Sequence, residues 1–252
     1  MIRLAWLSTV GRSAIRVVRC WLIRVNNREG GEAAVDAERF ATGLTYEQFK
    51  AQMTRNRDAL EEIEAGVKLD PRDATYFRSL KPLHVAVFVE DWCGDVVANL
   101  PVVAALAEEV GPALELRCFI KDQNRDLIDR YLNRGRFESI PVLACFDEGW
   151  REVGVLIERP VAVTERREED LREIYAGHPE FGSPDESPST LPDDVRERLR
   201  SLTNERRRSW RPWAERQLIL ALRDCAARAP QIGERVPHQA PAAAVTQAPK
   251  PA

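Results

Sequence analysis

The sequence predicts an α/β fold: a central mixed β-sheet flanked by helices, with a helical C-terminal extension. Short apolar runs rich in β-branched residues, typical of buried strands, alternate with segments of helical periodicity. Strand–helix–strand repeats of this kind imply parallel pairing. The last two strand-like runs are separated only by the turn at 147–149, so they should form an antiparallel hairpin, which makes the sheet mixed.

The composition fits one globular domain with extensions. The 252 residues are 44% hydrophobic and 31% charged, and the net charge of −3 favours no particular class of partner. The five cysteines are odd in number and scattered, which argues against a disulfide framework and for a reducing compartment. No run approaches the ~18 apolar residues of a membrane span. Arginines also interrupt any apolar signal core, so we expect a cytoplasmic protein without stable membrane insertion.

Residues 1–44 are predicted to be a basic, poorly ordered leader. Residues 1–28 contain six arginines and no acid, in a pattern that could form an amphipathic helix. Such a helix would suit a membrane surface or a targeting role. The alternative, which we favour, is a disordered leader or an over-extended start.

The main domain is predicted over residues 45–176. Thr45 can cap a first helix that continues to Gly66, and residues 68–73 have the composition of a turn. A proline at position 101 should kink the helix that contains it. In chain order, the further elements are a strand over 83–89, a helix over 94–110, a strand over 114–120, a helix over 124–133, strands over 141–146 and 150–157, and a helix over 165–175.

Beyond this domain we expect a linker over 177–192, one or two charged helices over 193–228 and a disordered Pro/Ala-rich tail over 229–252. Pro212 should begin a new helical turn. Arginines surround Trp210 and Trp213, a mixture that could contact nucleic acid. Acidic residues are interspersed among them, so we favour packing of the tryptophans and expect no nucleic-acid partner.

The stretch VEDWCGDVV, residues 89–97, places Trp92 and Cys93 directly after the first predicted strand. Together with Ile140-Pro141 before a later strand and Asp-Gln-Asn at 122–124, it resembles thioredoxin over residues 45–176. The WCGD variant is similar to a bacterial branch of thioredoxin-like proteins. The resemblance implies a thioredoxin-like fold and a cis Pro141 facing Cys93. It also implies a substrate groove formed by Trp92, Gly94, Asp95, Ile140 and Pro141.

Cys93 is the predicted catalytic residue. At the amino end of a helix, unpaired N–H groups and the helix dipole favour the thiolate, which is the nucleophile of disulfide exchange. Three departures from the family pattern weaken this chemistry. Val96 stands in place of the second motif cysteine, Val87 stands where the family has a buried acid, and Asp95 adds a negative charge that opposes thiolate formation. We therefore do not expect a conventional dithiol reductase.

The other cysteines and the histidines offer little further chemistry. Cys118 and Cys145 lie in predicted core strands, where small thiols usually pack. Cys20 and Cys225 would reach Cys93 only if the extensions fold back. Neither His84 nor His178 shows a partnership with Cys93 in the sequence. The cysteine spacing matches no metal site and no glycine-rich phosphate loop is present, so no metal or cofactor is expected.

Three functional hypotheses follow. The first is a monothiol redox protein in which Cys93 exchanges disulfides with a protein or a low-molecular-weight thiol, and an external thiol resolves the adduct. The second is a redox-inactive module whose groove at Trp92, Ile140 and Pro141 holds an extended peptide. The third is an adaptor in which the C-terminal helices carry the interaction. The sequence makes no prediction of the oligomeric state.

Overall fold

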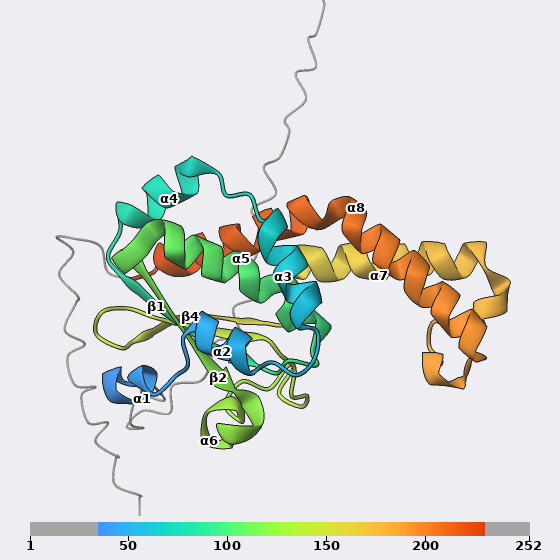
Figure 1. Ribbon diagram of the computed structural model, residues 1–252, viewed down its shortest axis with the longest axis horizontal. Helices are drawn as coiled ribbons and strands as arrows, with labels where there is room; N and C mark the ends of the chain where they lie inside the picture. Colours follow the sequence, from blue (N-terminus) through green and yellow to red (C-terminus); the bar gives the residue numbers. More distant parts are fainter. Residues whose placement is uncertain (1–34, 230–252) are drawn as a thin grey trace, which may run out of the picture.

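Four β-strands form a single sheet in the order β2-β1-β3-β4 within residues 35–229, the part of the chain that the computed structural model describes. Strand β2 is parallel to β1, whereas the β1–β3 and β3–β4 pairs are antiparallel, so the predicted mixed sheet is confirmed (Figure 1). The predictions for the leader before residue 35, including Cys20, and for the tail after residue 229 lie outside the described residues. The strands are β1 Leu83–Val89, β2 Leu114–Ile120, β3 Val142–Phe146 and β4 Glu152–Ile157.

Strand β1 is one of the two central strands of the sheet. It has a neighbouring strand on each side, and every residue in it except His84 is buried. A strand that is covered on both faces needs apolar side chains at consecutive positions, which is why β1 appears in the sequence as an unbroken apolar run. Strand β1 leads directly toward Cys93, so a central and almost fully buried strand holds the start of the motif in place.

Helices cover the sheet. In Figure 1, α4, α5 and the C-terminal half of α8 lie together above the sheet, and α1 and α6 lie below it. The helices are α1 Ala37–Ala41, α2 Tyr46–Gln52, α3 Arg57–Gly66, α4 Pro71–Arg78, α5 Gly94–Val110, α6 Arg125–Ile128, α7 Val161–Gly177 and α8 Asp193–Ala226.

The N-terminal part of the domain differs from the sequence prediction. Thr45 caps α2 in a capping box with Gln48, but the single helix expected up to Gly66 is broken into α2 and α3. The break ends at Asn56, whose φ of 55° is left-handed and incompatible with a continuous helix. The turn expected over 68–73 instead begins α4, because Asp70 caps the helix and Pro71 occupies its first turn.

Other boundaries also shift. Residues 35–44, expected in the leader, include α1, and Phe40 of this helix is buried in the main core. The helix expected over 124–133 is only the four-residue α6, and α7 begins four residues earlier than predicted. Both α5 and α8 continue through their prolines, Pro101 and Pro212, so the predicted interruption at Pro212 is wrong. A proline removes one helical hydrogen bond, and packing on both sides of it preserves the helix.

Helix α8 belongs to two apolar clusters. Its C-terminal half packs into the main core through Leu218, Ile219, Leu222 and Cys225. Its N-terminal half packs against the end of α7 in a smaller cluster of Ile174, Phe181 and Leu199. Residues 171–206, here called the arm, project from the body of the domain in Figure 1. The expected linker over 177–192 is therefore anchored at Phe181, which is 1% exposed.

A buried carboxylate joins α4 to α8. The side chain of Asp73 is 1% exposed and accepts hydrogen bonds from the guanidinium groups of Arg216 and Arg223, the latter at 3.0 Å. Arg223 also lies over the ring of Tyr76, 3.9 Å from its centroid. This network holds the C-terminal half of α8 against the first part of the domain.

Helix α5 is the most apolar helix of the described chain. By length and composition alone, Gly94–Ala113 could cross a membrane. Its apolar residues are used in the core, because α5 packs against α3, α4, α8 and strand β2. Core packing accounts for its composition.

Candidate functional site

Cys93 occupies the N-cap position of α5, at the end of the short turn that follows β1. Its side chain is half-buried, and the thiol donates a hydrogen bond to the carbonyl oxygen of Ile140 at 3.4 Å. The Ile140–Pro141 peptide bond is cis, as the resemblance implied. The structure thus brings Cys93 together with Ile140 and Pro141 just before β3.

The turn that carries Trp92 and Cys93 is fixed by its neighbours. The carboxylate of Asp91 accepts hydrogen bonds from the backbone N–H groups of Thr54 at 2.7 Å and Arg55 at 3.0 Å. Burial acts to raise the pKa of Asp91, but these hydrogen bonds outweigh it and hold that pKa below its ordinary value. The break between α2 and α3 therefore supplies the groups that orient the turn.

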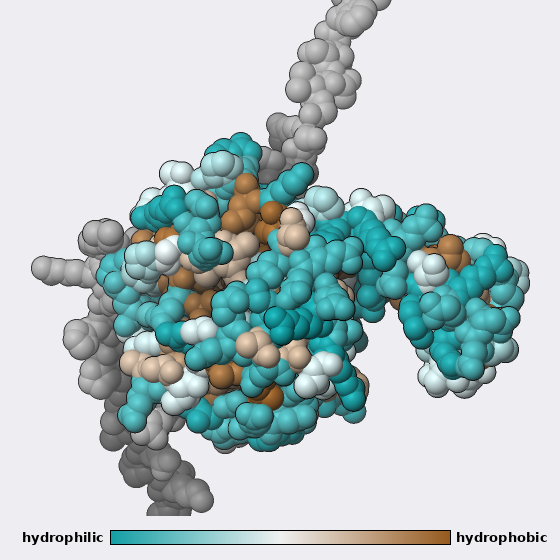
Figure 2. All heavy atoms as spheres, viewed as in Figure 1, coloured by the Kyte–Doolittle hydropathy of each residue, from teal (hydrophilic) through white to brown (hydrophobic). Residues whose placement is uncertain are grey.

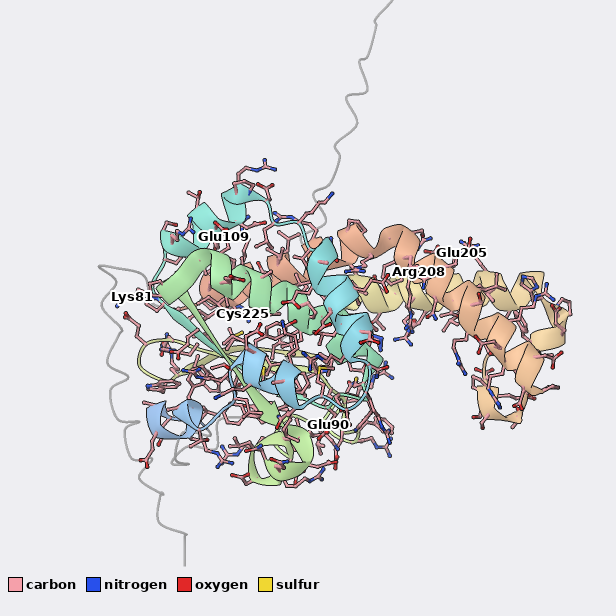
Figure 3. All side chains as sticks on the ribbon, viewed as in Figure 1. Lys81, Glu90, Glu109, Glu205, Arg208 and Cys225 are labelled. Carbon is pink, nitrogen blue, oxygen red and sulfur yellow. The ribbon has the colours of Figure 1, made fainter. Side chains whose placement is uncertain are left out.

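The Asp-Gln-Asn stretch lies at the same end of the sheet. The backbone N–H of Asp122 donates to the carboxylate of Glu90 at 3.0 Å, and Glu90 follows β1 directly (Figure 3). Asn124 donates to the carbonyl of Ile120 at 2.8 Å and so closes the turn after β2. This stretch supports the motif turn from the neighbouring strand.

The two apolar replacements in the motif are fully buried. Val96 and Val87 are each 0% exposed. Val96 packs in the first turn of α5, and Val87 lies between Cys118 of β2 and Leu143 of β3 in the sheet. Neither position offers a thiol or an acid to Cys93, so the sulfur has no proton-handling or resolving partner at these two positions.

Asp95 points to a group of arginines. Its carboxylate lies 3.4 Å from Arg159 and 3.5 Å from Arg167. Arg159 is held in place by Glu158, whose N–H donates to the carbonyl of Pro141 at 2.7 Å. The carbonyl of Glu158 accepts a hydrogen bond from Asn99 of α5 at 3.1 Å. The end of β4 is thereby tied both to the cis-proline and to the helix that begins at Cys93.

The pKa of Cys93 is raised above its ordinary value. Burial is the largest cause; the backbone amides of Val96 and Asp95 act in the opposite direction, and the negative charges of Asp95 and Glu158 raise the pKa further. The effect of Asp95 has the direction expected from the sequence. Burial disfavours the thiolate more than the amides at the helix start favour it.

Comparison with known proteins gives the family. A family model described as thioredoxin matches residues 43–172, just over half of the chain. The chain belongs to the thioredoxin family. None of the curated proteins matches it in sequence.

Two solved structures are similar to this thioredoxin-family chain. One is the crystal structure of a protein of unknown function from Pseudomonas aeruginosa, with 19% identity, a TM-score of 0.46, and coverage of 66% of this chain and 92% of that chain. The other is the crystal structure of an HIV epitope-scaffold, with 19% identity, a TM-score of 0.45, and coverage of 67% of this chain and 94% of that chain.

The predicted groove residues of this thioredoxin-family chain lie in different environments. Trp92 is 50% exposed beside Cys93, and Gly94 is exposed with open space where a Cβ would stand. Ile140 and Pro141 are buried, so they offer a substrate mainly their backbone. Asp95 is engaged by arginines, and it is better described as an electrostatic neighbour of Cys93 than as part of the groove.

Within residues 35–229, the other cysteines and the histidines are buried or contact neighbouring side chains. Cys118, Cys145 and Cys225 are buried. His84 stacks on Trp150 with ring centroids 4.4 Å apart, and His178 lies 3.2 Å from Glu180. Within residues 35–229, no group of three histidine, cysteine or acidic side chains is placed to hold a metal ion.

The tryptophans of α8 differ from each other. Trp210 donates a hydrogen bond from its ring nitrogen to Asp170 at 2.6 Å, so it packs as expected. Trp213 meets Trp210 edge-on and remains 39% exposed. The absence of a nucleic-acid partner stays a prediction.

The arginines around Asp95 were missed by sequence analysis. Arg159 and Arg167 lie more than sixty residues from Asp95 in the chain, and Arg207 lies farther still, so no local motif links them. The only sequence signal is the run of arginines at 206–208, which belongs to the segment around Trp210 and Trp213 for which we favoured packing of the tryptophans. The connection depends on how α7 and α8 pack beside α5.

We predict that Asp95→Asn lowers the pKa of Cys93. The substitution removes a negative charge that raises this pKa and leaves Arg167 without its carboxylate partner, while the backbone amide at position 95 is retained. The rate of Cys93 alkylation against pH, followed by mass spectrometry, should have a midpoint above that of a free thiol in the wild type and a lower one in the variant. Cys93→Ser identifies the labelled residue. An unchanged midpoint in Asp95→Asn would contradict the electrostatic assignment.

Proposed function

We propose that this protein is a monothiol member of the thioredoxin family that exchanges disulfides through Cys93. The observation that supports this proposal is the 3.4 Å contact between the sulfur of Cys93 and the carbonyl of Ile140. A substrate segment paired with the backbone at Ile140 would lie against the half-buried sulfur. The substrates would be protein or low-molecular-weight disulfides in a reducing compartment, for which we propose the cytoplasm.

The exchange has two steps. The Cys93 thiol loses its proton to solvent, and the thiolate attacks one sulfur of the substrate disulfide. A bond forms between Cys93 and that sulfur while the substrate disulfide breaks, and the second substrate sulfur leaves as a thiolate. An external thiolate then attacks the mixed disulfide on the substrate sulfur and releases Cys93. The external thiol is needed because position 96 holds valine.

The raised pKa of Cys93 makes this exchange slow at neutral pH without preventing it. A higher pKa reduces the fraction of thiolate, but the thiolate that forms is a better nucleophile, with a Brønsted coefficient of about 0.4–0.5. A thiol of high pKa is also a poor leaving group, so a mixed disulfide on Cys93 should persist until an external thiol attacks it. Slow attack and a persistent mixed disulfide suit a protein that stays covalently bound to its substrate until an external thiol releases it.

The test uses a neutral disulfide, hydroxyethyl disulfide, with the full-length protein and intact-mass detection. In a Cys20→Ser background, we expect one adduct, on Cys93, that forms faster as the pH rises and disappears on addition of dithiothreitol. Adding Cys93→Ser to this background should remove the adduct. If the folded protein forms no adduct at Cys93 even at alkaline pH, the monothiol proposal is overturned.

The second candidate is a redox-inactive peptide-binding module. It is supported by exposed aromatic residues near the cis-proline: Trp92 is 50% exposed, and Phe137, three residues before Ile140, is 59% exposed. Exposed aromatic side chains are common anchors for protein partners. A protein that binds an extended peptide but forms no adduct at Cys93 would fit this candidate.

A further inference from the structure

A cavity of about 270 Å³ opens beside the start of α5 at the base of the arm. It is lined by residues of α3, α5, α7 and α8 and of the segment between β4 and α7. Figure 3 labels Arg208 on α8 in this region, and Figure 2 shows hydrophilic side chains covering the same face where the arm leaves the body. We call this cavity the arginine pocket, after Arg159, Arg167, Arg207, Arg208 and Arg211, which line it.

The positive charge in the arginine pocket is only partly compensated. Arg211 is paired with Glu215 at 2.8 Å. Arg159 pairs with Glu158 at 3.1 Å and also shares the carboxylate of Asp95 with Arg167. The acidic residues that line the pocket are Glu62, Asp95 and Glu215. They are fewer than the five arginines of the lining. Arg207 and Arg208 form no ion pair with any residue in the described part of the chain.

Burial makes this excess positive charge unfavourable. Burial lowers the pKa of Arg167 to about 10, and repulsion from Arg159 and Arg207 adds to the effect. Burial also lowers the pKa of Arg207. The side chain of Arg159 is 12% exposed, and its Nε is buried without a hydrogen-bond partner among the described residues. Buried cations are normally balanced by anions, and an incoming anion would offset the excess positive charge of this group of arginines.

The pocket also has an apolar part. Ile63 of α3, Val163 of α7 and Trp210 of α8 line it together with three alanines. Most of the surface inside the pocket is apolar. Its charged groups are the guanidinium groups of the arginines and a smaller number of carboxylates. A hydrated inorganic ion would leave this apolar surface unused, whereas an organic anion would cover it.

We propose that the arginine pocket binds a small organic anion with a phosphate or carboxylate group and an apolar body. The anionic group pairs with Arg207 and Arg208, whose planar guanidinium groups suit two-point contact with either kind of oxyanion. The apolar body packs on Ile63, Val163 and Trp210. This site is distinct from the sulfur chemistry: the pocket begins at Gly94 and Asp95, and Cys93 does not line it.

The test measures the affinities of three probes by isothermal titration calorimetry at low ionic strength: phenyl phosphate, benzoate and inorganic phosphate. Phenyl phosphate or benzoate should bind more tightly than inorganic phosphate, and the tighter of the two identifies the anionic group. The double variant Arg207→Gln/Arg208→Gln should weaken binding about tenfold or more, because each lost contact is a charge-assisted hydrogen bond. Cys93→Ser should leave the affinity unchanged, which separates this inference from the monothiol proposal.

The matched control is Arg198→Gln/Arg200→Gln. Arg198 and Arg200 lie on the same helix α8 and pair with Glu180 and Glu197, which do not line the arginine pocket. Their substitution removes the same amount of positive charge as the test variant. An equal loss of affinity in this control would indicate diffuse attraction and overturn the proposal, as would the absence of binding at millimolar probe. Arg208→Gln alone, at an exposed position, tests the pocket if the double variant folds poorly. Asp95→Asn should tighten binding, because it removes a negative charge from the pocket lining and leaves Arg167 without its carboxylate partner. Weaker binding would contradict the proposal.

Discussion

Replacing Asp73 by alanine is expected to lower the free energy of unfolding by about 3 kcal/mol, because removing one partner of a buried ion pair leaves the other uncompensated. The side chain of Asp73 is 1% exposed and binds both Arg216 and Arg223. Those arginines are 39% and 28% exposed, so water can partly solvate them, and the cost should fall at the lower end of the range for buried pairs. Urea unfolding followed by circular dichroism measures the change, and the melting temperature should fall by roughly 6–12 °C.

The control for Asp73 is an exposed ion pair on helix α8, the helix that carries Arg216 and Arg223. Glu197 and Arg200 are 65% and 61% exposed, and Glu197→Ala should change stability by no more than about 0.5 kcal/mol. A loss of similar size in Asp73→Ala would show that α8 does not depend on this carboxylate for its position against α4.

The second large effect is expected from Val96→Cys, which should give the protein dithiol reductase activity. Position 96 is the third residue of α5 and Cys93 is its N-cap, and the side chain of an N-cap residue lies close to the backbone at this position. A cysteine at position 96 should therefore reach the mixed disulfide on Cys93. An intramolecular thiol acts at a far higher effective concentration than millimolar external thiol, so turnover should rise on the order of 100-fold or more.

Reduction of insulin, followed by turbidity with dithiothreitol as the electron donor, measures this gain. Val96→Thr has a similar shape without a thiol and should remain as slow as the wild type. The double variant Cys93→Ser/Val96→Cys should also be slow, since the attacking sulfur is missing. A folded Val96→Cys protein with no gain would mean that the sulfur of Cys93 is not presented to disulfides.

The strands of the sheet could be predicted because their signal is local. The bounds of β1 and β2 agree with the prediction, since each is a short apolar run ended by residues that do not continue a strand. The positions of Cys93 and Pro141 followed from the family pattern, and the contact between Cys93 and Ile140 agrees with it. A buried strand and a short motif can be recognised because each depends on residues that are neighbours in the sequence.

The remaining features depend on tertiary contacts. The break before α3 rests on hydrogen bonds to Asp91, which lies over thirty residues away. The raised pKa of Cys93 depends on burial, which the motif does not encode. The arginine pocket needs α7 and α8 to pack beside α5, and the arginines of α8 alone have the pattern of an exposed face. Long-range packing decided each of these outcomes.

The position of α8 has a consequence for folding during synthesis. Leu218, Ile219, Leu222 and Cys225 complete the main core, and Arg223 binds Asp73 from 150 residues away. While the ribosome is still adding α8, the apolar surface that this helix covers on α4 and α5 stays open to solvent, and chains in that state are prone to association. A chain shortened before residue 193 would keep this surface exposed permanently. Removal of α8 therefore removes part of the main core. A truncated protein would show the effects of misfolding, and these would mask any loss of a partner that binds the arm.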